Sequence, residues 1–353
     1  MTAPPPDQPR TPPPPLESSI AKHLRSSVAG TPTKERPEFD SFTSRFDPSV
    51  TSVAIAYLGV QSRRMDDPTA AREISALAKS LAAEHPADHL EHCVYVDEVG
   101  FQVQMIVAYW LDPDSFERWF LAGGRGWATP REGLGFFTEF VTPTMTRLET
   151  LHSSPQDLQG VAALARGPSN PIYEHGYWGG MRDRIPDSQT SALAASGSMA
   201  YAAAASQAVR VEAADNLCLI RSGQDYSATA GAEREFYLRE VEPQLRAGME
   251  FLRDHGRGIG CFENRYVTVV SADRTPTDRT FAVSLWRDIA DLEAWAKSHP
   301  THVRIFNAFT EHMKKFGDDA RLRLYHEVVV VPRDHQHYEY AGCHAQTGLL
   351  RDR

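Results

Sequence analysis

From about residue 50 onward, hydrophobic positions recur with strand or helix periods. Val53–Val60 is a continuous apolar run typical of a buried strand. Asp66-Asp67-Pro68 follows, and an acidic cap before a proline predicts the start of a helix, which the Ala- and Leu-rich pattern continues to about Ala83. The first half is then completed by two predicted strands near 92–97 and 101–111, a short helix over about 113–121 and a longer helix over about 134–151.

The second half of the chain repeats this plan. Leu217–Ile220 is a predicted strand, and a long helix over 232–254 ends at Asp254-His255-Gly256. Further predicted elements are strands near 260–270 and 280–286, helices over about 289–297 and 300–316, and a last strand over about 321–331.

Two pairs of tryptophans link the halves. Trp110 and Trp119 stand nine residues apart, as do Trp286 and Trp295, and each pair opens at a strand end and closes on the following helix. Chance recurrence of aromatic core positions is one explanation, and a diverged duplication is the other. Duplication predicts an α+β fold of two βαββαβ ferredoxin-like units, each with two helices on an antiparallel sheet. Two such sheets face to face would enclose a barrel-like interior.

The amino-terminal region has a different composition. It is rich in proline, including Pro12–Pro15, and poor in apolar residues, which predicts an extended, mobile tail without a catalytic role. It lacks the apolar segment of a secretory signal. The predicted organisation is a tail over 1–45, a first half over 46–165, a connecting region over 166–205, a second half over 206–333 and a terminal segment over 334–353.

Composition excludes several classes of partner. The 353 residues carry 37 Lys and Arg against 46 Asp and Glu, a net charge of −9. Nucleic acid and anionic membrane surfaces attract basic proteins, so neither is an expected partner. No apolar run reaches the roughly 18 residues of a membrane-spanning helix. Four scattered cysteines without CxxC or CxxCH suit a reducing compartment, so we expect a cytoplasmic protein without a thiolate zinc site or covalently attached c-type haem.

His302 is the first candidate for chemistry. In Ser298-His-Pro-Thr-His302 the proline fits the first turn of a helix, and His302 then begins an apolar stripe with Ile305, Phe306, Phe309 and Met313. A core histidine without chemical function would look the same. However, the helix N-terminus disfavours the imidazolium, and a neutral imidazole is what a metal ion binds. His312 falls off this stripe and is expected at the surface.

His326 lies on the last predicted strand. Alternation places His326 with Leu324 and Val328 on an interior face, and Glu327 on the other. Two histidines facing one interior are harder to explain as packing alone. Ser222 shares a strand face with Cys218, although Ser222-Gly223 also reads as a turn. Arg182 belongs to a Gly- and aromatic-rich loop of the kind that often contacts ligands, although a surface arginine would look similar.

Several strings together resemble the haem-containing aldoxime dehydratases, from about residue 50 onward. They are Glu174-His-Gly-Tyr-Trp-Gly with Met181-Arg182, Leu219-Ile-Arg-Ser-Gly-Gln-Asp225, Gly248-Met-Glu-Phe-Leu-Arg-Asp254, Ser298-His-Pro-Thr-His-Val-Arg-Ile-Phe306, Leu322-Arg-Leu-Tyr-His-Glu327, and Tyr338-Glu-Tyr340 with Leu350-Arg-Asp352.

The resemblance implies a homodimeric lyase that converts an aldoxime, R–CH=N–OH, to a nitrile and water. It implies a non-covalent haem b whose ferrous iron binds the oxime nitrogen, in a dimeric α+β-barrel-type fold related in plan to chlorite dismutases and dye-decolourising peroxidases. By the same resemblance, His302 is the axial iron ligand, His326 the distal acid and base, Ser222 the distal serine and Arg182 the distal arginine.

Other functions remain open from the sequence. A haem peroxidase or chlorite-dismutase-like enzyme could use the same architecture, and a haem carrier would perform no chemistry. A non-haem metal protein would need His302, His326 and a carboxylate such as Glu327, but strand alternation turns Glu327 away from the histidines. The sequence does not separate aryl from alkyl aldoximes.

Overall fold

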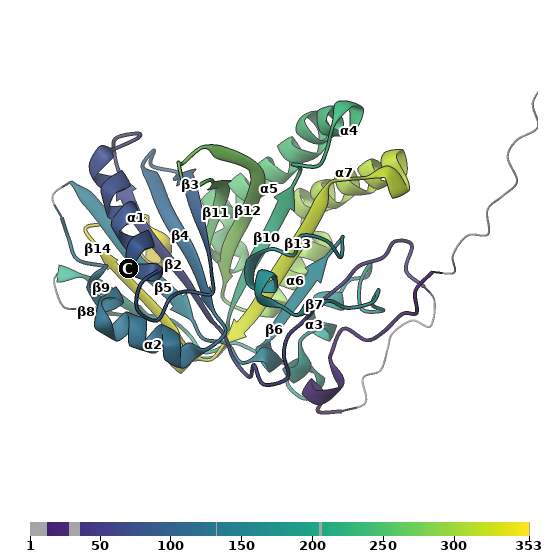
Figure 1. Ribbon diagram of the computed structural model, residues 1–353, viewed down its shortest axis with the longest axis horizontal. Coiled ribbons are helices and arrows are strands. Elements are labelled where there is room, and N and C mark those ends of the chain that lie inside the picture. Colours follow the sequence, from purple (N-terminus) through teal and green to yellow (C-terminus); the bar gives the residue numbers. More distant parts are fainter. Residues whose placement is uncertain (1–12, 28–35, 132, 205–206, 353) are drawn as a thin grey trace, which may run out of the picture.

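Twelve strands form one antiparallel sheet, with helices on its outer faces (Figure 1). The computed structural model describes residues 13–27, 36–131, 133–204 and 207–352. The strand order is β6-β13-β10-β12-β11-β3-β4-β2-β5-β14-β9-β8. Within the described residues the outer strands β6 and β8 do not pair with each other, so the chain forms one open sheet and not two facing sheets that close into a barrel.

The first half follows the predicted order up to its second helix. Asp67 caps the first helix by accepting hydrogen bonds from the backbone N–H groups of Thr69 and Ala70, and Pro68 occupies the first turn as expected. The elements are β2 (Ala54–Ser62), α1 (Pro68–Leu81), β3 (His89–Val96), β4 (Gln102–Trp110), α2 (Pro113–Ala122) and β5 (Leu134–Val141).

The predicted helix over 134–151 is wrong. The chain there forms strand β5 and then strand β6 (Leu148–His152). Leu134–Val141 is rich in aromatic and β-branched residues, which favour strands, and Pro143 breaks a helix because it has no N–H to donate.

The second half agrees closely with its predicted elements. Strand β10 includes Ser222, so this serine belongs to a strand and not to a turn. The long predicted helix contains a π-helical turn, Tyr237–Val241, between α4 and α5. The elements are β10 (Leu217–Asp225), α4 (Gly231–Phe236), α5 (Glu242–His255), β11 (Cys261–Val270), β12 (Pro276–Trp286), α6 (Ile289–Ser298), α7 (Pro300–Phe316) and β13 (Arg323–Val331).

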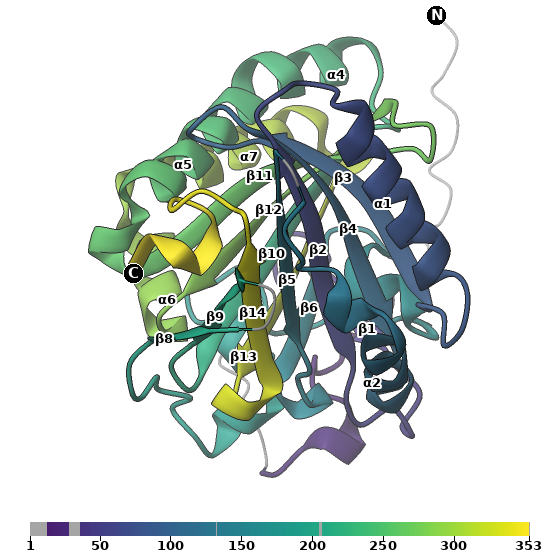
Figure 2. The same cartoon turned by 90° about the vertical axis from the view of Figure 1, so that its left-hand side faces the viewer.

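Strands β6 and β14 each pair with strands from the other part of the chain. Strand β6 pairs with β13, the edge strand of the second half. Strand β14 (Gln336–Ala341) follows the second half in sequence but pairs with β5 of the first (Figure 2). Two short strands, β9 (Val209–Glu212) and β8 (Ala200–Ala203), extend the sheet beyond β14. The halves are therefore interlocked.

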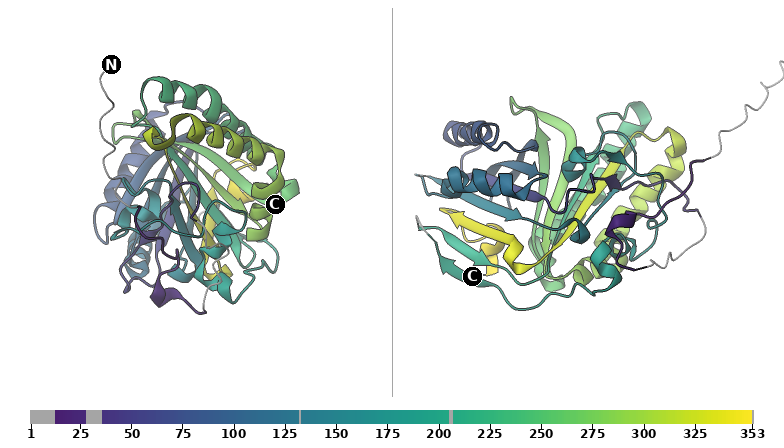
Figure 3. Two further views of the ribbon diagram at one scale, coloured as in Figure 1. Left: turned by 90° about the vertical axis from the view of Figure 1, so that its right-hand side faces the viewer. Right: turned by 60° about the horizontal axis from the view of Figure 1, so that its bottom comes forward.

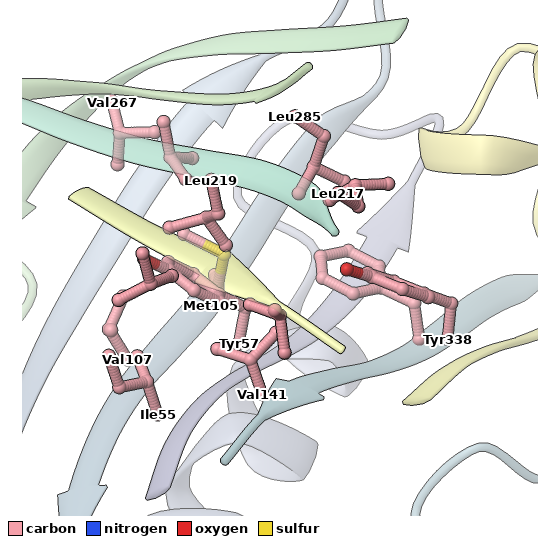
Figure 4. Packing of buried hydrophobic residues seen from close by; sticks show 14 of the residues in the cluster. Ile55, Tyr57, Met105, Val107, Val141, Leu217, Leu219, Val267, Leu285 and Tyr338 are labelled. Carbon is pink, nitrogen blue, oxygen red and sulfur yellow. The ribbon is translucent and has the colours of Figure 1, made fainter. Parts of the chain in front are cut away.

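The main hydrophobic core lies where the inner faces of the two halves meet, as Figure 4 shows for Tyr57, Met105, Leu219 and Tyr338. Strands β11 and β3 join the halves through three residue pairs. Two buried ion pairs also bridge them: Arg221 contacts Glu91 at 2.6 Å, and Arg265 contacts Glu139 at 2.6 Å.

The outer face of the second half has its own core. Helices α5, α6 and α7 lie across its strands (Figure 3, left). Leu245, Met249 and Trp295 pack there against Val328 and Val330. This helix-covered face is the one on which even-numbered residues of β10 and β13 lie.

The amino-terminal region packs against the protein, contrary to the expected mobile tail. We call residues 13–27 and 36–45 the strap, drawn in purple in Figure 1. Ile20 is only 4% exposed, Glu17 forms a β-bridge with Ile172, and Phe42 forms one with His152. Apolar Ile20 and the backbone bridges offset the low hydrophobicity from which a tail was predicted. Residues 1–12 lie outside the described residues.

Two further observations concern the pairing of the cysteines and the character of the helices. All four cysteines are free, and Cys93, Cys218 and Cys261 are buried. In the described part of the chain, no helix combines the length and the apolar character needed to cross a membrane.

Candidate active site

The junction between α6 and α7 positions His302. His299 caps α7 by accepting a hydrogen bond from the backbone N–H of Thr301, and Pro300 occupies the first turn, as the sequence predicts. Trp295 of α6 donates its indole N–H to the Thr301 hydroxyl at 3.0 Å. The Trp295 ring then lies 4.7 Å from the His302 ring, centroid to centroid. The imidazole is thus held by the packing of both helices.

The surroundings of His302 fit an axial ligand of haem. Burial lowers its pKa to about 4, although the nearby backbone carbonyl of Ala296 opposes the shift, so the imidazole is neutral at pH 7. Trp178 and Phe306 lie beside it, yet are 47% and 43% exposed. Uncovered aromatic side chains next to a neutral imidazole suit an apolar macrocycle bound through one nitrogen ligand.

Ser222 and His326 lie directly opposite each other on β10 and β13. Directly opposed side chains of antiparallel strands have Cβ atoms about 4.5–5.5 Å apart and point to the same face. That face continues through Cys218, Val328 and Val330 into the core beneath α5, α6 and α7. The expected distal serine and distal histidine are therefore brought together, on the side of the sheet that the helix carrying His302 covers.

His326 contacts a positive and a negative group through one ring nitrogen. Its Nε2 lies 2.8 Å from Nη2 of Arg184 and 3.0 Å from Oε1 of Glu149. Arg184 also donates from Nε to Glu149 Oε2 at 2.8 Å. A donor and an acceptor beside the same nitrogen support either protonation state of the ring.

Glu149 remains a carboxylate throughout the ordinary pH range. Its side chain is almost wholly buried, and burial alone would raise its pKa. The charges and hydrogen bonds of Arg184 and His326 outweigh burial and hold the pKa at about 2. Glu149 was missed from the sequence because it lies in the segment predicted as a helix.

Arg182, the arginine expected at this site, lies elsewhere. It donates to both carboxylate oxygens of Glu293 on α6 and to the carbonyl of Ala192. Within the described residues it makes no contact with His326. The short helix α3 (Gly180–Asp183) turns the chain between Arg182 and Arg184, so the two arginines point to different partners. The only sequence signal for Arg184 was its place two residues further along the same loop.

Glu327 lies on the opposite face of β13 from His326, as alternation predicts, but that face is also buried. Tyr109 donates its hydroxyl to Glu327 Oε1 at 2.9 Å, and the Val161 N–H donates to Oε2 at 2.7 Å. Burial raises the pKa of this carboxyl. Among the described residues no group of three or more His, Cys, Asp and Glu could hold a metal ion, which counts against a non-haem centre of His302, His326 and Glu327.

His312 is buried, so its expected surface position is wrong. Its ring packs against Phe236 and Phe316, and its Nε2 lies 3.4 Å from Oε1 of Glu233. Helix α4 covers this side of α7, which the pattern of α7 alone does not indicate.

The helix that carries the neutral His302 imidazole and the sheet face that carries the opposed Ser222 and His326 border the same hydrophobic cluster. The chain belongs to the haem-containing dehydratase family, whose model matches residues 56–349.

Relatives of known name agree with this family. An aliphatic aldoxime dehydratase of Rhodococcus erythropolis is 39% identical over 96% of this chain and 98% of its own length, and one of Pseudomonas chlororaphis is 38% identical over the same shares. A phenylacetaldoxime dehydratase of Bacillus sp. (strain OxB-1) is 29% identical over 90% of this chain and 93% of its own.

Solved structures agree as well. The fold superposes on a crystal structure of an aldoxime dehydratase with a TM-score of 0.89, at 37% identity, covering 95% of this chain and 98% of the other. An aldoxime dehydratase in complex with butyraldoxime gives a TM-score of 0.88 at 37% identity, covering 95% of this chain and 96% of that one.

Proposed function

We propose that this protein is a lyase that dehydrates aldoximes, R–CH=N–OH, to nitriles and water, with haem as its cofactor. The observation that carries the proposal is the opposed Ser222 and His326 on the sheet face covered by the helix of His302. The relatives named as aldoxime dehydratases, and the solved complex with butyraldoxime, support this choice among haem enzymes.

The reaction breaks the N–O and C–H bonds and forms an O–H bond and the third bond between carbon and nitrogen. The N–O bond breaks as the hydroxyl takes up a proton and leaves as water. The C–H bond breaks as its proton goes to a base, and its electron pair completes the C≡N bond. One proton is donated and one is recovered, so a single acid and base suffices, and an imidazole has a suitable pKa range for both roles.

His326 is the proposed acid and base. Because Arg184 and Glu149 engage Nε2, Nδ1 is the ring nitrogen that remains for the substrate. Glu149, charged at any working pH, lies 3.0 Å from Nε2 and can accept a hydrogen bond when that nitrogen carries a proton. Once Nδ1 has given its proton to the departing hydroxyl, its lone pair can accept the proton from carbon.

Ser222 is proposed to orient the oxime hydroxyl. Its position opposite His326 allows its O–H to contact the same substrate oxygen that receives the proton. Both groups lie on regular strands, which hold side chains more rigidly than loops do.

His302 is proposed to hold the haem, as the axial ligand of a non-covalent haem b. Haem held there would supply an iron that, when ferrous, could bind the oxime nitrogen and help to weaken the N–O bond. The absence of CxxCH, the neutral imidazole and the uncovered Trp178 and Phe306 support non-covalent binding by one ligand and apolar packing.

Alkyl aldoximes are the proposed substrates. The relatives named as aliphatic aldoxime dehydratases are 38–39% identical to this chain, and the phenylacetaldoxime dehydratase is 29% identical. Higher identity favours a pocket more like that of the aliphatic enzymes.

We also infer that the fold is a diverged duplication. The four strands of each half share one order, β5-β2-β4-β3 in the first and β13-β10-β12-β11 in the second, which is the ferredoxin-like order of a βαββαβ unit. The tryptophan pairs also correspond: the Trp110 and Trp119 rings lie 5.4 Å apart, and the Trp286 and Trp295 rings 5.7 Å. These units fall within the predicted segments 46–165 and 206–333.

Two further parts of the proposal concern the cell and the assembly. Four free cysteines, three of them buried, suit a reducing cytoplasm. A homodimer follows from the resemblance to the family and is tested by light scattering of the haem-loaded protein.

The deciding experiment measures nitrile formation from butyraldoxime under anaerobic conditions. Dithionite-reduced protein reconstituted with haem should release nitrile, and ferric protein should release much less. Peroxide-dependent oxidation of a dye without nitrile formation would favour a peroxidase. Haem binding without either reaction would favour a carrier.

A further inference from the structure

We infer that the strap helps to position the residues of the active site. Glu174 links the strap to the loop that carries Arg184, and this link makes Glu174 a positioning residue for His326. This inference rests on the proposed role of His326. The strap lies outside the stretch that the family model matches, which begins at residue 56.

Glu174 links the strap to Arg184 through both its side chain and its backbone. Its buried carboxylate accepts the Ser18 hydroxyl at 2.9 Å and the Ser19 backbone N–H at 2.7 Å. Its backbone carbonyl accepts Nη1 of Arg184 at 2.8 Å. The other two nitrogens of that guanidinium hold Glu149 and His326. A shift of Glu174 therefore shifts a hydrogen-bond partner of Arg184.

Arg45 fixes the strap at the same place. Its guanidinium donates to the backbone carbonyls of Ser18 and Ser19 at 2.7 and 2.6 Å, and forms an ion pair with Glu17 at 2.9 Å. The neighbouring Ser44 donates its backbone N–H to the hydroxyl of Thr150, the residue after Glu149. The strap thus contacts both sides of the Arg184–Glu149 pair.

The strap also separates this pair from bulk water. A partly open cavity of about 80 Å³ is lined by Ser19 and Leu24 of the strap and by Glu149 and Arg184. Removal of residues 13–27 would open it further to solvent. Because water weakens interactions between charges, the ion pair that orients His326 would loosen.

A second part of the strap reaches the helix of His302. The Phe39 ring lies 6.3 Å from Phe309 on α7 and 5.4 Å from His175, the residue after Glu174. Phe39 therefore contacts both the helix that carries His302 and the loop that leads to Arg184. Its contribution is to hold these two parts of the proposed site in position.

The test compares two truncations and two pairs of variants in the haem-loaded, reduced enzyme. Deletion of residues 1–27 should lower kcat by about tenfold or more, because small misplacements of catalytic groups are costly, with haem content near normal and KM within about threefold. Deletion of residues 1–12 is the matched control and should leave kcat unchanged. Arg45→Ala should lower kcat as the long deletion does, whereas Arg166→Ala, at an exposed ion pair with Asp47, should not.

Glu174 gives the sharpest comparison. Glu174→Ala should lower kcat by about tenfold, and Glu174→Gln, which keeps one acceptor oxygen, should restore part of it. If these variants lower only the unfolding midpoint and keep kcat, the strap is structural and the inference is overturned. If His326→Ala turns over normally, the proposed function itself fails. If His326→Ala is inactive while the strap variants keep kcat, the inference alone fails.

Discussion

His302 and His326 lie beside the same hydrophobic cluster, but the neighbours of the His302 ring are apolar and those of the His326 ring are charged. His302 is surrounded by tryptophans and phenylalanine, and burial keeps its ring neutral. His326 has a guanidinium and a carboxylate within 3.0 Å of one nitrogen. The first setting suits a nitrogen that binds iron, and the second suits a ring that gains and loses a proton.

Alanine variants of the two histidines should therefore differ, one in haem content and the other in kcat. His302→Ala should purify with little haem, because it removes the proposed protein–iron bond. His326→Ala should keep near-normal haem while its kcat falls by about 10²–10⁴, the usual contribution of a positioned acid or base. Soret absorbance and nitrile release measure the two effects.

A suitable control is His335→Ala, since that side chain is 42% exposed and contacts Thr142, outside the proposed site. It should change neither haem content nor kcat. Loss of haem in His326→Ala with retention in His302→Ala would reverse the assignment.

Arg184 and Arg182 give a second prediction at this scale. Arg184→Lys keeps the charge but loses the forked contacts to Glu149 and His326, so kcat should fall about tenfold or more. Arg182→Lys disturbs the contacts with Glu293 and with the Ala192 carbonyl, neither of which involves His326, and should lower kcat far less. Steady-state kinetics at matched haem content decide between them, and a larger loss in Arg182→Lys would restore the expectation from the sequence.

Ser222→Ala should keep haem and lower turnover. One positioned hydrogen bond typically contributes about 1–3 kcal/mol, roughly a 5- to 150-fold effect on kcat/KM. Ser298→Ala, at an exposed serine at the end of α6, serves as the control. Equal kinetics in both variants would contradict a role for Ser222.

At the residue scale the sequence named four candidate site residues, and the structure places two of them, Ser222 and His326, directly opposite each other. Periodicity along one element places His302 and His326 on interior faces, whereas the roles expected of these histidines and of Ser222 come from the resemblance to the family. Arg184 follows α3 directly, Glu149 lies on β6 and His326 on β13, and no local sequence pattern specifies that these three side chains meet. Arg182 and Arg184 stand two residues apart, and the sequence does not show which of them contacts His326; in the structure it is Arg184.

At the scale of elements, local signals decided which predictions succeeded. Helices α1, α6 and α7 begin with an acidic or histidine cap, in two cases before a proline, and their predicted starts are confirmed within a few residues. Strand β14 and the strap could not be predicted, since each is stabilised by partners more than a hundred residues away.

The α6–α7 junction carries a prediction of its own. Thr301→Val keeps the shape of the side chain but leaves the indole N–H of buried Trp295 without its acceptor, so the free energy of unfolding of the haem-free protein should fall by about 1–3 kcal/mol. Urea denaturation measures this loss. Thr310→Val, whose hydroxyl donates to a backbone carbonyl at an exposed site, should change stability far less. An unchanged Thr301→Val would mean that the tryptophan–threonine bond does not stabilise the junction.

For the whole molecule, buried histidines predict a loss of stability in mild acid. Burial lowers the pKa of His152, His175 and His302 to about 4, against about 6.5 in an unfolded chain. Between these values the unfolded chain binds more protons, so the stabilisation is complete above pH 6.5 and is lost as the pH falls toward 4. Each histidine contributes about 3 kcal/mol at most.

Urea denaturation of the haem-free protein between pH 7.5 and 4.5 measures this dependence. His175→Gln should flatten part of it, and His335→Gln at the exposed site should not. A free energy of unfolding that stays constant from pH 7 to 4.5 would contradict the prediction.

The exchange of strands between the halves affects how the chain folds while the ribosome synthesises it. Strand β5 ends at Val141, but its partner β14 ends at Ala341, 200 residues later. At about 5–20 residues per second, a ribosome needs roughly 10–40 s to supply that partner. Until then the nascent first half has an open strand edge beside exposed apolar side chains, a surface prone to pairing with other chains. Such a chain would depend on chaperones during synthesis, and stop codons ahead of β14 would yield aggregates rather than half-enzymes.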